Sequence, residues 1–126
     1  MPDQNPKKIM VAEDEKGLRT VLSERLREEG YEVVEAVDGL DAYQKMSTEL
    51  PDLAILDIRM PKKSGLTIYD DMRQESWGRK IQVMFLTNSS ALDNVAFAQK
   101  YGPVDYLVKS DWDLEDIIKK IQEKFA

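Results

Sequence analysis

Short runs rich in apolar residues alternate five times along the chain with amphipathic segments. The runs are four to six residues long and cover 9–12, 31–36, 53–56, 82–86 and 104–108. Runs of this length, bounded by glycine, proline or acidic residues, are typical of buried β-strands. The run at 53–56 is apolar at every position, which indicates a central strand covered on both faces.

The segments between these runs have apolar residues at helical spacing. Glycine and small polar residues mark several helix ends: Gly30 and Trp77–Gly78 as stops, and Asp38, Ser90 and Asp113 as N-caps, with Asp116 completing a shortened capping box. The residues that we expect to point inward are, helix by helix, Leu18, Val21, Leu22 and Leu26; Leu40, Tyr43, Met46 and Leu50; Leu66, Ile68, Tyr69 and Met72; Val95, Ala96, Ala98 and Tyr101; and Leu114, Ile117, Ile118, Ile121 and Phe125.

Alternation of strand and helix predicts an α/β fold, a doubly wound parallel sheet of five strands with helices on both faces. The strand order 2-1-3-4-5 is the one known for flavodoxin-like folds, and the alternation does not by itself single it out. The chain has 126 residues, which suits a single domain over 1–126.

Polar residues follow four of the predicted strands. Glu13 and Asp14 come after the first strand, Asp57 after the third, Thr87 after the fourth and Lys109 after the fifth. In the order 2-1-3-4-5 the first and third strands are neighbours, so their carboxyl ends bring the three acids together. Each residue alone is more commonly a turn former, cap or surface residue, and the combination is what indicates a site.

Composition limits the chemistry of this site. The chain has no cysteine and no histidine, which excludes thiol chemistry and removes the commonest metal ligand and neutral-pH acid–base group. The net charge of −6 argues against direct nucleic-acid binding. No apolar run approaches the length of a membrane span. Carboxylates, hydroxyls and lysines remain.

Three carboxylates in one crevice repel one another, by about 4 kcal/mol for two charges about 4 Å apart at an effective dielectric of about 20. Hard oxygen ligands suit Mg²⁺, and Mg²⁺ with Lys109 would bring the formal charge of the site to zero. A carboxylate in such surroundings is a plausible nucleophile for a phosphoryl group, so Asp57 is the expected acceptor. Thr87 offers a hydroxyl that can donate to the bound group.

Five separated elements resemble the receiver domains of two-component response regulators, of the chemotaxis-regulator type, over essentially the whole chain. They are Glu13–Asp14, the segment 56–61 with Gly65, Thr87, the small residues Ala96, Ala98 and Gly102, and the segment 105–109. The resemblance implies that Asp57 accepts a phosphoryl group from a histidine kinase. It also implies the other roles: Glu13, Asp14, Asp57 and the Arg59 main-chain carbonyl as Mg²⁺ ligands, Thr87 and Tyr106 as switch pair, and Lys109 as phosphate-binding lysine.

The same resemblance sets the expected partners. They are a sensor histidine kinase or phosphotransfer protein, and a downstream output protein or an output domain missing from this sequence. Phosphorylation would alter the surface made by the fourth helix, the fifth strand and the last helix. We expect a cytoplasmic monomer or phosphorylation-dependent homodimer that assists its own phosphorylation and dephosphorylation without being a turnover enzyme.

Four positions bear on how closely the family pattern is followed. Ser110 stands where the family usually has proline, and a cis bond before serine costs about 2.5–4 kcal/mol, so we expect a trans bond and an altered loop. Asn88 replaces a smaller residue after Thr87. Arg59 and Ser89 flank the path of hydrolytic attack, with an effect on phosphate lifetime whose sign the sequence does not give.

Three other functions compete with this interpretation. A phosphorylation-independent interaction domain would retain the acidic site as a relic, and Ser110 keeps this alternative open. A phosphatase of the haloacid dehalogenase type would place its Asp-x-Asp pair after the first strand, whereas Asp57 follows the third and Arg59 occupies the second position. A flavin-binding protein is disfavoured because Glu13, Asp14 and Glu15 would repel the flavin phosphate.

Overall fold

A computed structural model describes residues 6–87, 105–111 and 113–125 of the chain. Its elements, in chain order, are Lys8–Ala12 (β1), Lys16–Glu28 (α1), Glu32–Ala36 (β2), Gly39–Glu49 (α2), Leu53–Asp57 (β3), Gly65–Arg73 (α3), Ser76–Gly78 (η1), Gln82–Thr87 (β4), Asp105–Val108 (β5), Lys109–Asp111 (η2) and Leu114–Lys124 (α5). The predicted fourth helix with its cap Ser90, and the predictions for Asn88 and Ser89, lie outside the described residues.

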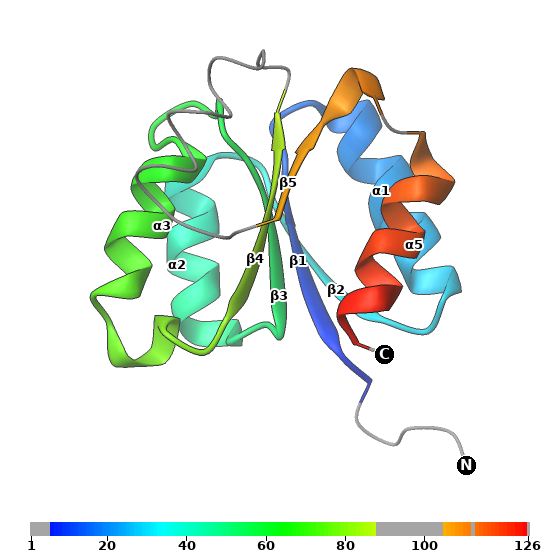
Figure 1. Cartoon of the computed structure of the whole chain (residues 1–126). Helices are drawn as coiled ribbons and strands as arrows, with labels where there is room; N and C mark the ends of the chain where they lie inside the picture. The colour runs from blue at the N-terminus through cyan, green and yellow to red at the C-terminus, as the bar shows by residue number, and fades with distance from the viewer. Residues whose placement is uncertain (1–5, 88–104, 112, 126) are drawn as a thin grey trace.

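The five strands form one parallel sheet in the order β2-β1-β3-β4-β5, which confirms the predicted doubly wound architecture. Helices α2 and α3 cover one face, and α1 and α5 cover the other (Figure 1). Because all strands run in the same direction, their carboxyl ends meet at one edge of the sheet.

Alternate residues of each strand enter two separate apolar cores. Met10 and Ala12 of β1 pack toward α2 and α3, whereas Ile9 and Val11 pack toward α1 and α5. Every residue of β3 is buried because this strand is central and both of its faces are covered. This explains the unbroken apolar run at 53–56.

Three apolar residues predicted to face inward do not. Val21, Leu40 and Leu50 are 49%, 45% and 54% exposed. The buried residues are instead Leu22, Ser23 and Leu26 in α1, and Gly39, Ala42 and Met46 in α2. Helical spacing gives a broad stripe, and the rotation of each helix on the sheet decides which flank of the stripe is buried.

Local hydrogen bonds account for most helix ends. The side chains of Asp38 and Asp113 accept from backbone N–H groups three residues on, at 2.8 and 2.9 Å, as predicted for N-caps. Gly30, just after α1, has φ of 96°, a conformation that favours glycine. The predicted stop of the third helix is wrong: α3 ends at Arg73, and Trp77–Gly78 belongs to the following 3₁₀ turn.

Within residues 6–87, 105–111 and 113–125, no helix combines the length and apolar character needed to cross a membrane. This agrees with the absence of a long apolar run in the sequence.

Leu50 ends α2 in a left-handed conformation, with φ of 48°, that is unfavourable for a residue with a Cβ atom. Leu50 is 54% exposed, so less apolar burial opposes a change to glycine than at a core position. We expect Leu50→Gly to raise the free energy of unfolding by about 0.5–1 kcal/mol in urea denaturation.

Gln44→Gly is the matched control, because Gln44 is an exposed residue inside the same helix. Glycine there should lower stability by up to about 1 kcal/mol. Equal losses in both variants would contradict the proposed strain at Leu50.

Candidate functional site

Strand register places the site residues at one edge of the sheet. Ala12 of β1 lies opposite Leu56 of β3, so Glu13 and Asp57 follow at the same level on neighbouring strands. Thr87 lies opposite Val108, which puts Lys109 just beyond the end of β4. The register therefore gathers residues that are far apart in sequence.

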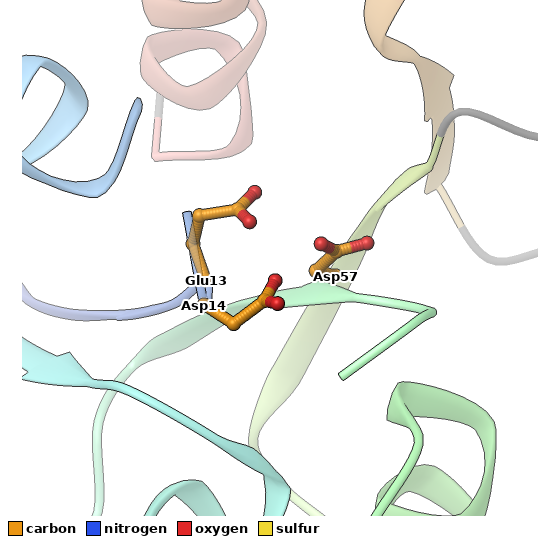
Figure 2. A group of neighbouring side chains, drawn as sticks. All are labelled: Glu13, Asp14 and Asp57. Atoms are coloured by element: carbon orange, nitrogen blue, oxygen red, sulfur yellow. The ribbon is translucent and has the colours of Figure 1, made fainter. Parts of the chain in front are cut away.

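The acidic side chains converge beyond the strand ends (Figure 2). Glu13, Asp14 and Asp57 each have a carboxylate oxygen within 4.8 Å of the others. Glu13 and Asp57 are 1% and 5% exposed, whereas Asp14 is exposed. Two of the three like charges are thus almost wholly removed from water, which requires compensation.

Lys109 supplies positive charge to both buried acids. Its Nζ lies 2.6 Å from Glu13 Oε1 and 3.1 Å from Asp57 Oδ2. Burial would lower the pKa of Lys109, but the hydrogen bond to Glu13 and the charge of Asp57 outweigh it and raise the pKa above its ordinary value. The ammonium group is therefore charged at neutral pH.

Backbone amides hold the remaining carboxylate oxygens of the buried acids. Glu15 N–H donates to Glu13 Oε2 at 3.1 Å, and Arg59 N–H donates to Asp57 Oδ1 at 3.2 Å. Each acid is therefore held between an amide and the ammonium group of Lys109, which fixes its orientation.

The loop after β3 packs tightly against the phosphoacceptor candidate. Gly65 N–H donates to the Ile58 carbonyl at 2.9 Å, and a Cβ atom on Gly65 would lie 2.5 Å from the Asp57 carbonyl oxygen. Gly39, at the start of α2, approaches the Lys63 carbonyl so closely that a Cβ atom would overlap it. These two glycines let the loop fold back over the strand end.

Thr87 and Tyr106 share one face of the sheet. Tyr106 lies opposite Phe85 and packs with it in the core beneath α2 and α3. Thr87, two residues beyond Phe85, points to the same side because side chains alternate along a strand. Thr87 is fully buried and Tyr106 is partly buried.

A family model described as "Response regulator receiver domain" matches residues 9–122, nearly the whole chain. The chain belongs to this family. The match confirms the resemblance inferred from the motifs: the chain is a receiver domain of the two-component response regulators.

Relatives of this receiver domain include the transcriptional regulatory protein PdtaR of Mycobacterium tuberculosis, 37% identical over 118 residues, which cover 93% of this chain and 56% of that protein. Sporulation initiation phosphotransferase F of Bacillus subtilis is 30% identical over 110 residues, covering 87% of this chain and 86% of that protein. The chain spans about half the length of most of the first relatives it matches.

A solved structure with the same fold is the response regulator TrrA of Thermotoga maritima in complex with Mg(2+)-BeF, with a TM-score of 0.78 and 32% identity over 93% of this chain and 97% of that chain. The CheY4 chemotaxis protein of Vibrio cholerae has a TM-score of 0.83 and 26% identity, covering 94% of this chain and 98% of that chain. These similarities confirm the flavodoxin-like fold class.

The acidic cluster of the receiver domain has the donors that a hard divalent cation requires. Opposite ligands of an octahedral Mg²⁺ lie about 4.2 Å apart, so a spread of 4.8 Å needs only small side-chain adjustments. Glu13, Asp14 and Asp57 therefore fit a Mg²⁺ site. The predicted role of the Arg59 carbonyl as a fourth ligand stays a prediction.

The segment after Lys109 follows the expectation for Ser110. The described residues contain no cis peptide bond, so the bond before Ser110 is trans. Residues Lys109–Asp111 form a 3₁₀ turn that leads toward α5. Lys109 still reaches both acids from this turn, so serine in place of proline does not prevent the contact.

Sequence reasoning missed one residue of the site. Arg19 donates from its guanidinium group to the Glu13 main-chain carbonyl at 2.8 Å. Arg19 lies one turn into the helix that follows the acidic pair. Helical side chains lean toward the N-terminus, so this position in the sequence indicates that Arg19 can reach the acidic loop.

We expect Lys109→Met to lower the free energy of unfolding by about 2 kcal/mol in Mg²⁺-free buffer, because two buried carboxylates lose their cationic partner. Urea denaturation in the presence of a chelator measures this. Lys119→Met, on the exposed side of α5, is the matched control and should change stability little. Similar effects of both variants would show that Lys109 does not offset the buried charge.

Proposed function

We propose that Asp57 of this receiver domain accepts a phosphoryl group from the phosphohistidine of a sensor histidine kinase or phosphotransfer protein, in a Mg²⁺-dependent reaction. The observation that carries the proposal is the convergence of Glu13, Asp14 and Asp57 at the carboxyl edge of the sheet. There, Lys109 donates a hydrogen bond to Asp57. An acidic cluster with two buried members and a lysine directed into it suits an incoming anionic group that is bound together with a cation.

In the proposed transfer, a carboxylate oxygen of Asp57 attacks phosphorus. An O–P bond forms as the N–P bond of the phosphohistidine breaks, and the bonding electron pair remains on the imidazole nitrogen. Asp57 needs no general base because it reacts as the carboxylate. The hydrogen bond from Arg59 N–H holds its side chain in place during the attack.

Mg²⁺, when bound, would supply charge stabilisation for the phosphoryl oxygens. Lys109 would provide the second positive charge. Its ammonium group would stay close to the Asp57 side chain and donate a hydrogen bond to a phosphoryl oxygen. Thr87, buried at the end of β4, would donate its hydroxyl to the same group. The TrrA structure, a complex with Mg(2+)-BeF, supports the choice of Mg²⁺ among hard divalent cations.

The proposed response is a shift between two packings of the sheet edge. Movement of Thr87 toward the phosphoryl group would leave space on the face it shares with Tyr106, and Tyr106 would turn inward. This alters the surface near β5 and α5 only if the phosphorylated protein favours the inward position of Tyr106. The predicted fourth helix would complete that surface.

The proposed readout of this surface is by an output protein or by an output domain in a longer chain. PdtaR is named a transcriptional regulatory protein, and the match covers 56% of its length, which supports the second arrangement. We propose that the domain acts in the cytoplasm as a phosphoacceptor, without turnover of a separate substrate. A phosphorylation-dependent homodimer and a monomer are both compatible with this function.

We expect incubation with acetyl phosphate and Mg²⁺ to add one phosphoryl group to the wild-type protein, detected by intact-mass spectrometry. Asp57→Ala should abolish the adduct, because it removes the acceptor oxygen. The matched control Asp116→Ala changes an exposed carboxylate of α5 and should retain the adduct.

An adduct that persists in Asp57→Ala would refute this acceptor. Absence of any adduct, with a folded protein and no binding of beryllofluoride, would instead favour the phosphorylation-independent alternative. Beryllofluoride binding without an adduct would point to rapid hydrolysis of the aspartyl phosphate.

We expect Thr87→Ala to leave the amount of phosphoryl adduct largely unchanged. The change in the Tyr106 amide chemical shift on phosphorylation should become smaller, because the hydroxyl that couples the phosphoryl group to Tyr106 is removed. Thr20→Ala, on the exposed side of α1, is the control and should respond like the wild type. Shift changes at Tyr106 equal to those of wild type would exclude the coupling.

A further inference from the structure

Arg19 connects the acidic loop to the end of β2. Its side chain is 13% exposed and lies one turn into α1. Nη1 donates to the Glu13 carbonyl at 2.8 Å and lies 3.5 Å from the Asp14 carbonyl. On its other side, Nε lies 3.5 Å from Glu35 Oε1. The guanidinium thus contacts the backbone of both acidic residues and none of their carboxylates.

The partner of Arg19 on β2 is itself held in place. Glu35 Oε2 lies 3.1 Å from Arg27 Nη2, and the Glu35 carbonyl accepts from Lys45 at 2.8 Å. The neighbouring backbone is tied as well, because Glu13 N–H donates to the Ala36 carbonyl at 3.2 Å. Arg19 therefore fastens the acidic loop to a strand end that Arg27 and Lys45 also hold.

We propose that Arg19 is a positioning residue for the cation site, which rests on the Mg²⁺ dependence proposed above. The loop carries two of the three carboxylates, and Arg19 fixes its backbone so that both point toward Asp57. A planar guanidinium can donate to carbonyls and pair with a carboxylate at the same time. The flexible ammonium group of lysine, a single point charge, does not reproduce this arrangement.

A purely electrostatic role for Arg19 would have the opposite effect on cation binding. A positive charge near the site disfavours Mg²⁺, so removal of that charge alone would tighten binding. Removal of a backbone anchor would instead weaken binding, because the carboxylates lose their common orientation. The direction of the change in affinity therefore distinguishes the two roles.

The test is a Mg²⁺ titration followed by amide chemical shifts in the wild type, Arg19→Gln and Arg19→Lys. Positioning predicts that both variants bind Mg²⁺ about 10-fold more weakly, although the lysine variant keeps the charge. Arg27→Gln is the matched control. This substitution removes the same charge from the same helix. Arg27 also pairs with Glu35 but does not contact the acidic loop, so the Mg²⁺ affinity of the variant should stay near that of the wild type.

A second readout separates positioning from a general loss of structure. The amide shifts of residues 13–15 without Mg²⁺ should change in both Arg19 variants, whereas urea midpoints should stay close to those of Arg27→Gln. Tighter binding by Arg19→Gln together with unchanged binding by Arg19→Lys would overturn the proposal in favour of a charge effect. Wild-type protein that binds no Mg²⁺ would refute the cation site itself, and with it the role of Arg19.

Discussion

Mutual repulsion between buried carboxylates is the constraint on which the organisation of this site depends. Glu13 and Asp57 are almost excluded from water and lie at the same level of adjacent strands. Lys109 contacts both, and it comes from the end of β5, two strands away from β3. The charge balance therefore requires β1, β3, β4 and β5 to form in register, so the electrostatics of the site and the assembly of the fold are not independent. Lys109 provides part of the compensation that a divalent ion would also supply.

The architecture was predictable because each level of the sequence pattern pointed the same way. Five apolar runs of strand length, amphipathic segments between them and capping residues such as Asp38 and Asp113 are all local features with direct physical causes. The acidic residues and Lys109 were predictable as a group for a different reason. Parallel strands bring their carboxyl ends to one edge, so a list of the residues that follow each strand approximates a description of the site.

Features that depend on the rotation of a helix or on backbone contacts were not predictable. Val21 and Leu40 fit helical stripes but lie on exposed flanks, because the rotation of each helix on the sheet buries Ser23 and Ala42 instead. Leu50 lies beyond the last turn of α2 and no longer follows its periodicity. Arg19 acts on main-chain carbonyls, so the residue types of the acidic loop do not indicate the contact, and only its position one turn into α1 does.

The close approach of Gly39 and Gly65 to neighbouring backbone has a consequence for how this domain tolerates change. The loop from 58 to 64 is confined between the end of β3, the start of α3 and the start of α2, with hydrogen bonds to Ile58 and Pro61 at its two sides. Such a loop has no room for an added residue, because any lengthening would push α2 or α3 away from the sheet. Diversity among domains built this way is therefore expected in the outward side chains of the loop, as at Arg59 and Lys62, while its length stays constant.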